Sequence, residues 1–183
     1  MLISNSNPKR LMSLFLLGAC LVGCSRLSDS PPSETSDHVF VTRRTLEPDK
    51  LASIWLIKRF VDRDAKFVFV GDDAPLTSEG IPFDTSEAEF RRYATLSCFE
   101  SILRKHPVTE PGIERLTKLI HDIEINYWAN PLSPDSLNLR HRLLAIVEAH
   151  PAQPEACLGP AFAVFDAFLA DSKPSQDLPG IAP

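Results

Sequence analysis

An early stretch of the chain carries the pattern of a strand, a helix and a second strand. Val39-Phe40-Val41-Thr42 is β-branched or aromatic, as strands usually are, and Lys66–Val70 has the same character. Between them, Pro48 and Asp49 open a run of apolar residues at helical spacing that ends near Asp62. Asp49 is the expected N-cap of this helix. The pattern predicts a compact βαβ unit.

Beyond this unit, prolines and short loops separate stretches of helical periodicity. We expect an extended piece at 81–85 and then four helices. The expected helices begin at Thr85 or Ser86, at Ile113, at Ser136 and at Glu155, and the last of them ends at Ala170. The predicted fold class is therefore α+β and mainly helical, with an N-terminal βαβ unit followed by about four helices.

Near the N-terminus, a short apolar run ends with Leu21-Val22-Gly23-Cys24, and Lys9 and Arg10 precede that run. The run is too short to span a bilayer as a mature helix. Its pattern resembles the bacterial lipoprotein signal, which is cut before the cysteine, and the cysteine then carries lipid. The alternatives are an ordinary cleaved signal peptide and an uncleaved N-terminal helix.

The lipoprotein interpretation divides the chain into four parts. Residues 1–23 are the expected signal peptide, 24–37 a flexible tether, 38–170 the folded domain and 171–183 a disordered tail rich in Pro, Ser and Asp. Lipid on Cys24 would make the membrane a partner of the mature protein. Serine follows Cys24, which indicates the periplasmic side of the cell envelope at the outer membrane.

Net charge argues against nucleic acid as a partner. Removal of residues 1–23 takes away two basic residues and no acidic ones, so the formal charge moves from -5 to -7. Binding to a phosphate backbone requires a basic surface instead.

Two cysteines remain in the expected domain once Cys20 leaves with the signal and Cys24 carries lipid. In an oxidising compartment Cys98 and Cys157 form either one disulfide or two separate buried thiols. Their spacing suggests no redox catalysis.

One dense polar cluster, His121-Asp122-Ile123-Glu124, lies in the expected helix that begins at Ile113. His121 and Glu124 are three residues apart and share a helix face, whereas Asp122 points about a quarter-turn away. An imidazole and a carboxylate so placed suit a divalent transition metal such as Zn²⁺, Fe²⁺ or Mn²⁺, with Glu100 and Asp84 as candidate further ligands. The alternative is an ordinary surface pair between His121 and Glu124.

The order of these motifs resembles the C-terminal domain of the chromate-resistance protein ChrB family. The matching segments are Val41–Arg43, Asp49–Asp62, Phe67–Val70, Ile81–Asp84, Cys98–Glu100, His121–Glu124 and Val164–Ala167. The resemblance covers roughly Val39 to Ala170. The long run from Asp49 to Asp62 is its most specific part.

The resemblance implies a role in chromate resistance. Longer members carry an additional N-terminal domain linked to regulation of a chromate transporter operon, and this chain has a signal and tether in that place. Polar positions that match the family support a metal or oxyanion site, namely Asp84, Glu100, His121, Asp122 and Glu124. Many members place a histidine shortly before the Cys98-Phe99-Glu100 segment, where this chain has Arg91-Arg92-Tyr93.

Two arginines at family positions, Arg43 and Arg59, are candidate oxyanion ligands, because guanidinium groups suit a tetrahedral dianion such as chromate. With Asp49 they are expected to shape a pocket at the edge of the βαβ unit. The alternative is an ion-pair network that fixes the strand to the helix.

Three functions follow from these observations. The first is a lipid-anchored accessory domain that binds a metal or chromate in the cell envelope. The second is a metalloenzyme that detoxifies chromate or the oxidants derived from it. The third is a scaffold or interaction domain without a ligand.

Overall fold

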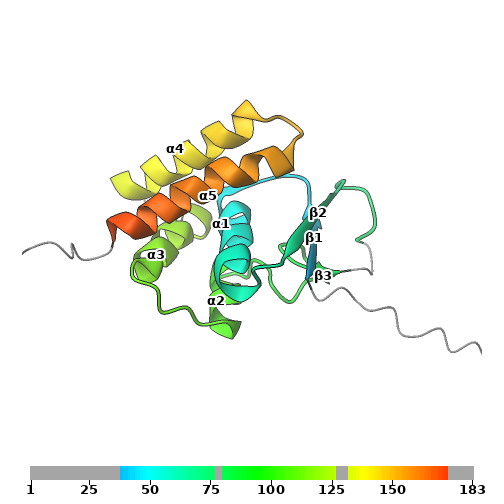
Figure 1. The fold of residues 1–183 in the computed structure, drawn as a ribbon, viewed down its shortest axis with the longest axis horizontal. Helices are drawn as coiled ribbons and strands as arrows, with labels where there is room; N and C mark the ends of the chain where they lie inside the picture. The colour runs from blue at the N-terminus through cyan, green and yellow to red at the C-terminus, as the bar shows by residue number, and fades with distance from the viewer. Residues whose placement is uncertain (1–37, 77–79, 127–131, 173–183) are drawn as a thin grey trace, which may run out of the picture. The chain divides into compact units, whose positions relative to one another are not determined.

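A computed structural model of the chain describes residues 38–76, 80–126 and 132–172. These residues belong to one compact unit. The predicted signal peptide, the lipidation site Cys24, the tether and residues 173–183 of the predicted tail lie outside them. Within the described residues a three-stranded sheet is followed by mainly helical structure, which confirms the predicted α+β class (Figure 1).

The sheet is built from three parallel strands: β1 (Val39–Arg43), β2 (Lys66–Val70) and β3 (Ile81–Pro82). β1 lies in the middle, because the strand order is β2-β1-β3. On one face of the sheet the rings of Phe40, Phe67 and Phe83 contact one another, with centroids 5.9–6.2 Å apart. The strand–helix–strand order confirms the predicted βαβ unit.

Helix α1 (Pro48–Leu56) is the central helix, and all of its residues are buried. It continues directly into a π-helical turn, η1 (Ile57–Val61). Proline at the first helical position suits the helix start, since its missing N–H would have no helical partner there. The N-cap residue is Glu47, so the prediction that Asp49 caps this helix was wrong.

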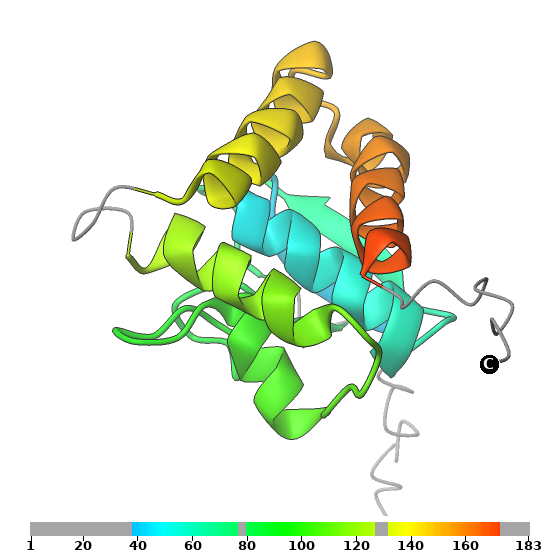
Figure 2. The ribbon, with the colours of Figure 1, turned by 90° about the vertical axis from the view of Figure 1, so that its left-hand side faces the viewer.

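Four further helices surround α1, as Figure 2 shows. They are α2 (Cys98–Lys105), α3 (Ile113–Glu124), α4 (Pro134–Ala149) and α5 (Pro154–Asp171). The predicted starts of α3, α4 and α5 agree with the structure to within two residues. In the described part of the chain, none of these helices is long and apolar enough to cross a membrane.

The segment between β3 and α2 differs from the prediction of a helix from Thr85 or Ser86. It is irregular, with Asp84 at a φ of 50° and a bridge between Phe83 and Phe90. The helix begins only at Cys98, because the side chain of Ser97 accepts a hydrogen bond from the Glu100 backbone in a capping box. Pairing of the chain with itself therefore overrides the helical periodicity.

Helix α5 is tied to the first helical segment by one carboxylate. Trp55 donates its indole N–H to Asp166 Oδ1 at 2.8 Å, and Arg59 contacts Asp166 Oδ2 at 2.6 Å. The rings of Trp55 and Phe165 pack at 5.3 Å. The salt bridge lowers the pKa of Asp166, so the carboxylate is charged at neutral pH and holds both partners.

The structure decides between a disulfide and two separate thiols for Cys98 and Cys157. Cys98 and Cys157 are both free and buried. They are two separate thiols, and burial raises the pKa of each.

The start of α3 meets the end of α5 at a glycine. Gly112 has a φ of 89°, and a Cβ there would lie 2.6 Å from Ser172 Cβ. Gly159, inside α5, has nothing within 4 Å of an added Cβ. The two glycines therefore make a matched pair.

We expect Gly112→Ala to lower the free energy of unfolding by about 1–3 kcal/mol, because alanine would be strained at this positive φ and its Cβ would clash with Ser172. Gly159→Ala should have a smaller effect, because helix propensity favours alanine by about 0.5–1 kcal/mol while Pro160 disfavours a Cβ on the helical residue before it. Urea titrations followed by circular dichroism measure both. Equal effects of the two substitutions would contradict the described contact between α3 and α5.

Candidate functional site

The start of α1 follows the carboxyl end of β1, and β3 is the neighbour of β1 in the sheet. Open parallel sheets often bind ligands beyond the carboxyl ends of their strands. The start of α1 lies here. Lys50 is only 4% exposed, and its ammonium donates to the carbonyls of Arg43 (3.2 Å) and Thr45 (2.6 Å) and lies 3.4 Å from Asp84 Oδ2. Lys50 thus joins the ends of both strands.

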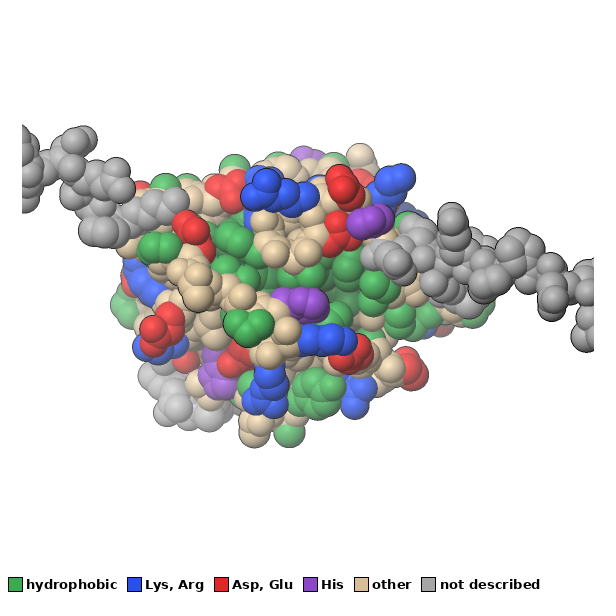
Figure 3. All heavy atoms as spheres, turned by 60° about the horizontal axis from the view of Figure 1, so that its bottom comes forward, with side chains coloured by type: hydrophobic (Ala, Val, Ile, Leu, Met, Phe, Trp, Pro, Cys, Tyr) green, Lys and Arg blue, Asp and Glu red, His purple; other side chains and the backbone are tan. Residues whose placement is uncertain are grey.

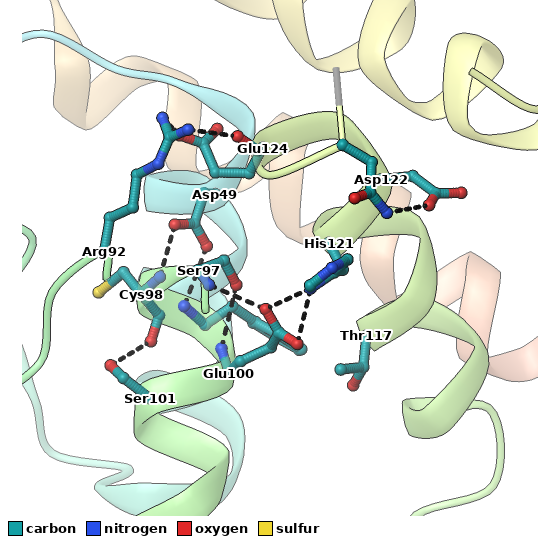
Figure 4. A network of polar contacts seen from close by, with 12 residues as sticks. Asp49, Arg92, Ser97, Cys98, Glu100, Ser101, Thr117, His121, Asp122 and Glu124 are labelled. Atoms are coloured by element: carbon teal, nitrogen blue, oxygen red, sulfur yellow. Dashed lines mark hydrogen bonds and ion pairs between the residues drawn. The ribbon is translucent and has the colours of Figure 1, made fainter. Parts of the chain in front are cut away.

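Asp49, the residue beside it, joins α1 to α2. Its side chain is 3% exposed, and its two oxygens accept hydrogen bonds from the backbone N–H groups of Cys98 (2.7 Å) and Phe99 (2.9 Å). These are the first amides of α2, which lack partners inside their own helix. Asp49 therefore satisfies the N-terminus of a neighbouring helix (Figure 4).

Burial raises the pKa of Asp49 to about 7, against 3.8 ordinarily. The two amides act in the opposite direction, and the nearby carboxylates Asp84 and Glu124 raise the pKa further. The proton of Asp49 is therefore exchangeable near neutral pH. A buried carboxyl group with a strongly shifted pKa is a candidate functional residue.

Glu100 and His121 form the second part of the cluster, across α2 and α3. His121 Nδ1 lies 3.0 Å from both Glu100 oxygens, and Glu100 Oε2 also accepts from the Ser97 backbone N–H at 2.8 Å. The structure thus brings together two of the predicted metal ligands, His121 and Glu100. It does not form the alternative surface pair of His121 with Glu124.

Glu124 has a different partner. Arg92 donates to Glu124 Oε1 at 2.6 Å and to the Glu124 carbonyl at 2.7 Å. Burial raises the pKa of Glu124, and Arg92 opposes that shift. Beside this pair lies a hollow of about 250 Å³ lined by Glu47, Pro48, Arg92, Ile123, Glu124, Arg140 and Leu144.

Two other predicted ligands have partners outside the pair of His121 with Glu100. Asp122 accepts hydrogen bonds from Asn126 Nδ2 and Ser136 Oγ, both at 3.2 Å, and therefore faces α4. Asp84 pairs with Lys50. Within residues 38–76, 80–126 and 132–172, no three His, Cys, Asp or Glu side chains are placed so that they could hold a metal ion together.

The two candidate oxyanion arginines are engaged elsewhere. Arg43 donates to the backbone carbonyls of Gly71 and Ala74, and Arg59 pairs with Asp166. Asp49 bonds to α2. The predicted pocket shared by Arg43, Arg59 and Asp49 is therefore not formed, because each group satisfies a different local partner. Arg59 does belong to a structural ion pair, but one that joins η1 to α5.

Arg92 and Lys50 were missed as parts of the site. Arg92 lies in the irregular segment that the periodicity assigned to a helix, so its contact with Glu124 had no signal in the sequence. Lys50 stands beside Asp49 in the most specific run of the resemblance. Its burial could have been anticipated from the apolar residues that follow it.

Comparison with known proteins identifies the family. The family model described as ChrB, C-terminal domain, matches residues 40–172. The chain belongs to the ChrB C-terminal domain family. All parts of the cluster around Asp49 fall within the matched residues. No solved structure matches the chain.

Protein ChrB of Cupriavidus metallidurans is a relative of this ChrB-family chain. The two are 30% identical over 95 residues, which are 51% of this chain and 29% of that protein. This chain thus covers less than a third of its relative.

A carboxyl group with a higher pKa in the folded than in the unfolded chain binds its proton more tightly when folded. Its contribution to stability is full below the unfolded pKa and is lost as pH rises through the folded pKa. For Asp49 that window runs from about 4 to about 7.

We therefore expect the free energy of unfolding to contain an Asp49 contribution that falls by up to about 1.4 kcal/mol per pH unit in this window. Asp49→Asn should remove that slope and also lower stability, since the amide cannot accept from both α2 N–H groups. Urea unfolding between pH 4 and 8 measures the slope. Glu114→Gln, at an exposed position of α3, is the control, and an unchanged slope in Asp49→Asn would refute the assignment.

Proposed function

We propose that this protein is a lipid-anchored accessory domain of chromate resistance, and that the cluster around Asp49 binds a divalent transition-metal cation. Membership of the ChrB C-terminal domain family supports the role in chromate resistance. The observation that carries the binding proposal is the convergence of α1, α2 and α3 on the buried carboxyl group of Asp49 and the partly buried carboxyl groups of Glu100 and Glu124.

Charge favours a cation over an oxyanion in this cluster. The carboxyl groups of Asp49, Asp84, Glu100 and Glu124 outnumber the fixed cations Lys50 and Arg92. On the face in Figure 3, acidic and basic side chains are interspersed. A chromate dianion would meet this surplus of negative charge, whereas a metal cation would relieve it.

Metal binding needs a rearrangement of the side chains, because no three ligands of the described residues are already placed to share a metal ion. If His121 donates its Nδ1–H to Glu100, Nε2 is the nitrogen left for a metal, and a carboxylate that orients a histidine in this way is common around metal sites. Glu124 would have to exchange Arg92 for the metal. Arg92 comes from an irregular segment, which has no helical hydrogen bonds to break when it moves.

We expect the purified full-length chain to bind about one divalent transition metal and to release protons as it does so, because carboxyl groups of raised pKa must ionise. His121→Ala should weaken binding at least about tenfold. Elemental analysis and calorimetry in buffers of different ionisation enthalpy measure these effects. His141→Ala, an exposed histidine of α4, is the matched control.

Absence of metal from the wild type, or equal loss in the two histidine variants, would overturn the metal site and favour a ligand-free interaction domain. Turnover of chromate or superoxide by the metal-loaded chain would instead make the protein an enzyme.

The anchor is tested separately. We expect cells fed labelled palmitate to label the wild type and not Cys24→Ala, since the thiol is the point of lipid attachment. The same substitution should lower chromate tolerance when it replaces the wild type in the host. Labelling that persists in Cys24→Ala, or an unlabelled wild type, would exclude the lipid anchor.

A further inference from the structure

Among the described residues, no strand pairs with the outer edge of β2. β2 is an end strand of the sheet there, and β1 is its neighbour in the strand order. Lys66 N–H donates to the His38 carbonyl, and the Val70 carbonyl accepts from Arg44 N–H, so residues 66, 68 and 70 turn their backbone groups toward β1. The backbone groups of Phe67 and Phe69 consequently point outward. Exposed strand edges of this kind pair readily with another chain.

The β2 sequence is complementary to itself when a second copy pairs with it antiparallel about a twofold axis beside Val68. Phe67 then lies opposite Phe69 of the second copy, and Lys66 lies opposite Val70. Aromatic pairs across strands are stabilising, and no like charges meet within the strand. Any shift by one residue would turn the side chains of the second copy to the wrong face.

The hydrogen bonding matches this register. A pair of directly opposed residues in an antiparallel ladder exchanges both N–H and C=O groups. Phe67 and Phe69 are the residues whose backbone groups point outward. In this register Phe67 pairs with Phe69 of the second copy, and Phe69 pairs with Phe67 of the second copy. All four outward groups of each strand thereby find partners, while Val68 sits at the axis with its side chain 42% exposed.

We propose that two copies of this chain associate through their β2 edges, with Val68 facing Val68 across a twofold axis, to form one continuous six-stranded sheet. Dimers related by a twofold axis are the commonest protein assembly. The association lies on the sheet edge and is independent of the site around Asp49.

Cross-linking tests the register. The two Val68 residues form a directly opposed pair that exchanges no hydrogen bonds. The Cα atoms of such a pair are about 4.5 Å apart, which a disulfide can span. We expect Val68→Cys in the full-length chain to give a reducible dimer under mild oxidation. Lys66→Cys is the matched control on the same face, because its two copies would lie roughly 13 Å apart. Wild type sets the baseline for the native cysteines.

Sedimentation equilibrium in detergent tests the association without a new cysteine. Val68→Lys places two like charges at the axis and should weaken the dimer at least several-fold, whereas Val68→Thr should preserve it. The proposal is overturned if Val68→Cys cross-links no more than Lys66→Cys, or if Val68→Lys and Val68→Thr have the same dissociation constant. A cross-link to a different protein would equally overturn it.

Discussion

The hydrogen bonds that Asp49 accepts from the first amides of α2 are the contact on which the rest of the domain depends. They join the helix that covers the sheet to the helix that carries Glu100, and Glu100 in turn orients His121 on α3. Without this carboxylate, buried amides at the start of α2 would have no acceptor, which is costly in the interior. Three helices are thus positioned by one side chain.

The same contact links architecture to chemistry. A carboxyl group buried deeply enough to hold α2 also acquires a pKa of about 7, because burial penalises its charged form. The residue that organises the fold is therefore also the one whose charge responds most readily to protons or to a bound cation. Structural and binding roles are not alternatives for Asp49, since both arise from its burial between helices.

Local sequence patterns predicted the secondary-structure elements that depend on residues close together in the chain. The βαβ unit and helices α3, α4 and α5 were predicted from residue spacing, and Glu100 was named as a candidate partner of His121 in a metal site. The segment before α2 was mispredicted, because a bridge between Phe83 and Phe90 overrides its periodicity. Arg59 was assigned to a pocket, but its partner Asp166 is 107 residues away, beyond any local pattern.

The junction of Trp55 and Arg59 with Asp166 has a consequence for biogenesis. Trp55 is 111 residues from Asp166 along the chain, so the first helix acquires this partner only when the last helix has been made. A core closed by segments so far apart in sequence forms late, because the chain between them must lose conformational entropy before they can meet. Until α5 has been made, the indole N–H of Trp55 therefore lacks this acceptor, and α1 lacks one of the contacts that fix it in the domain.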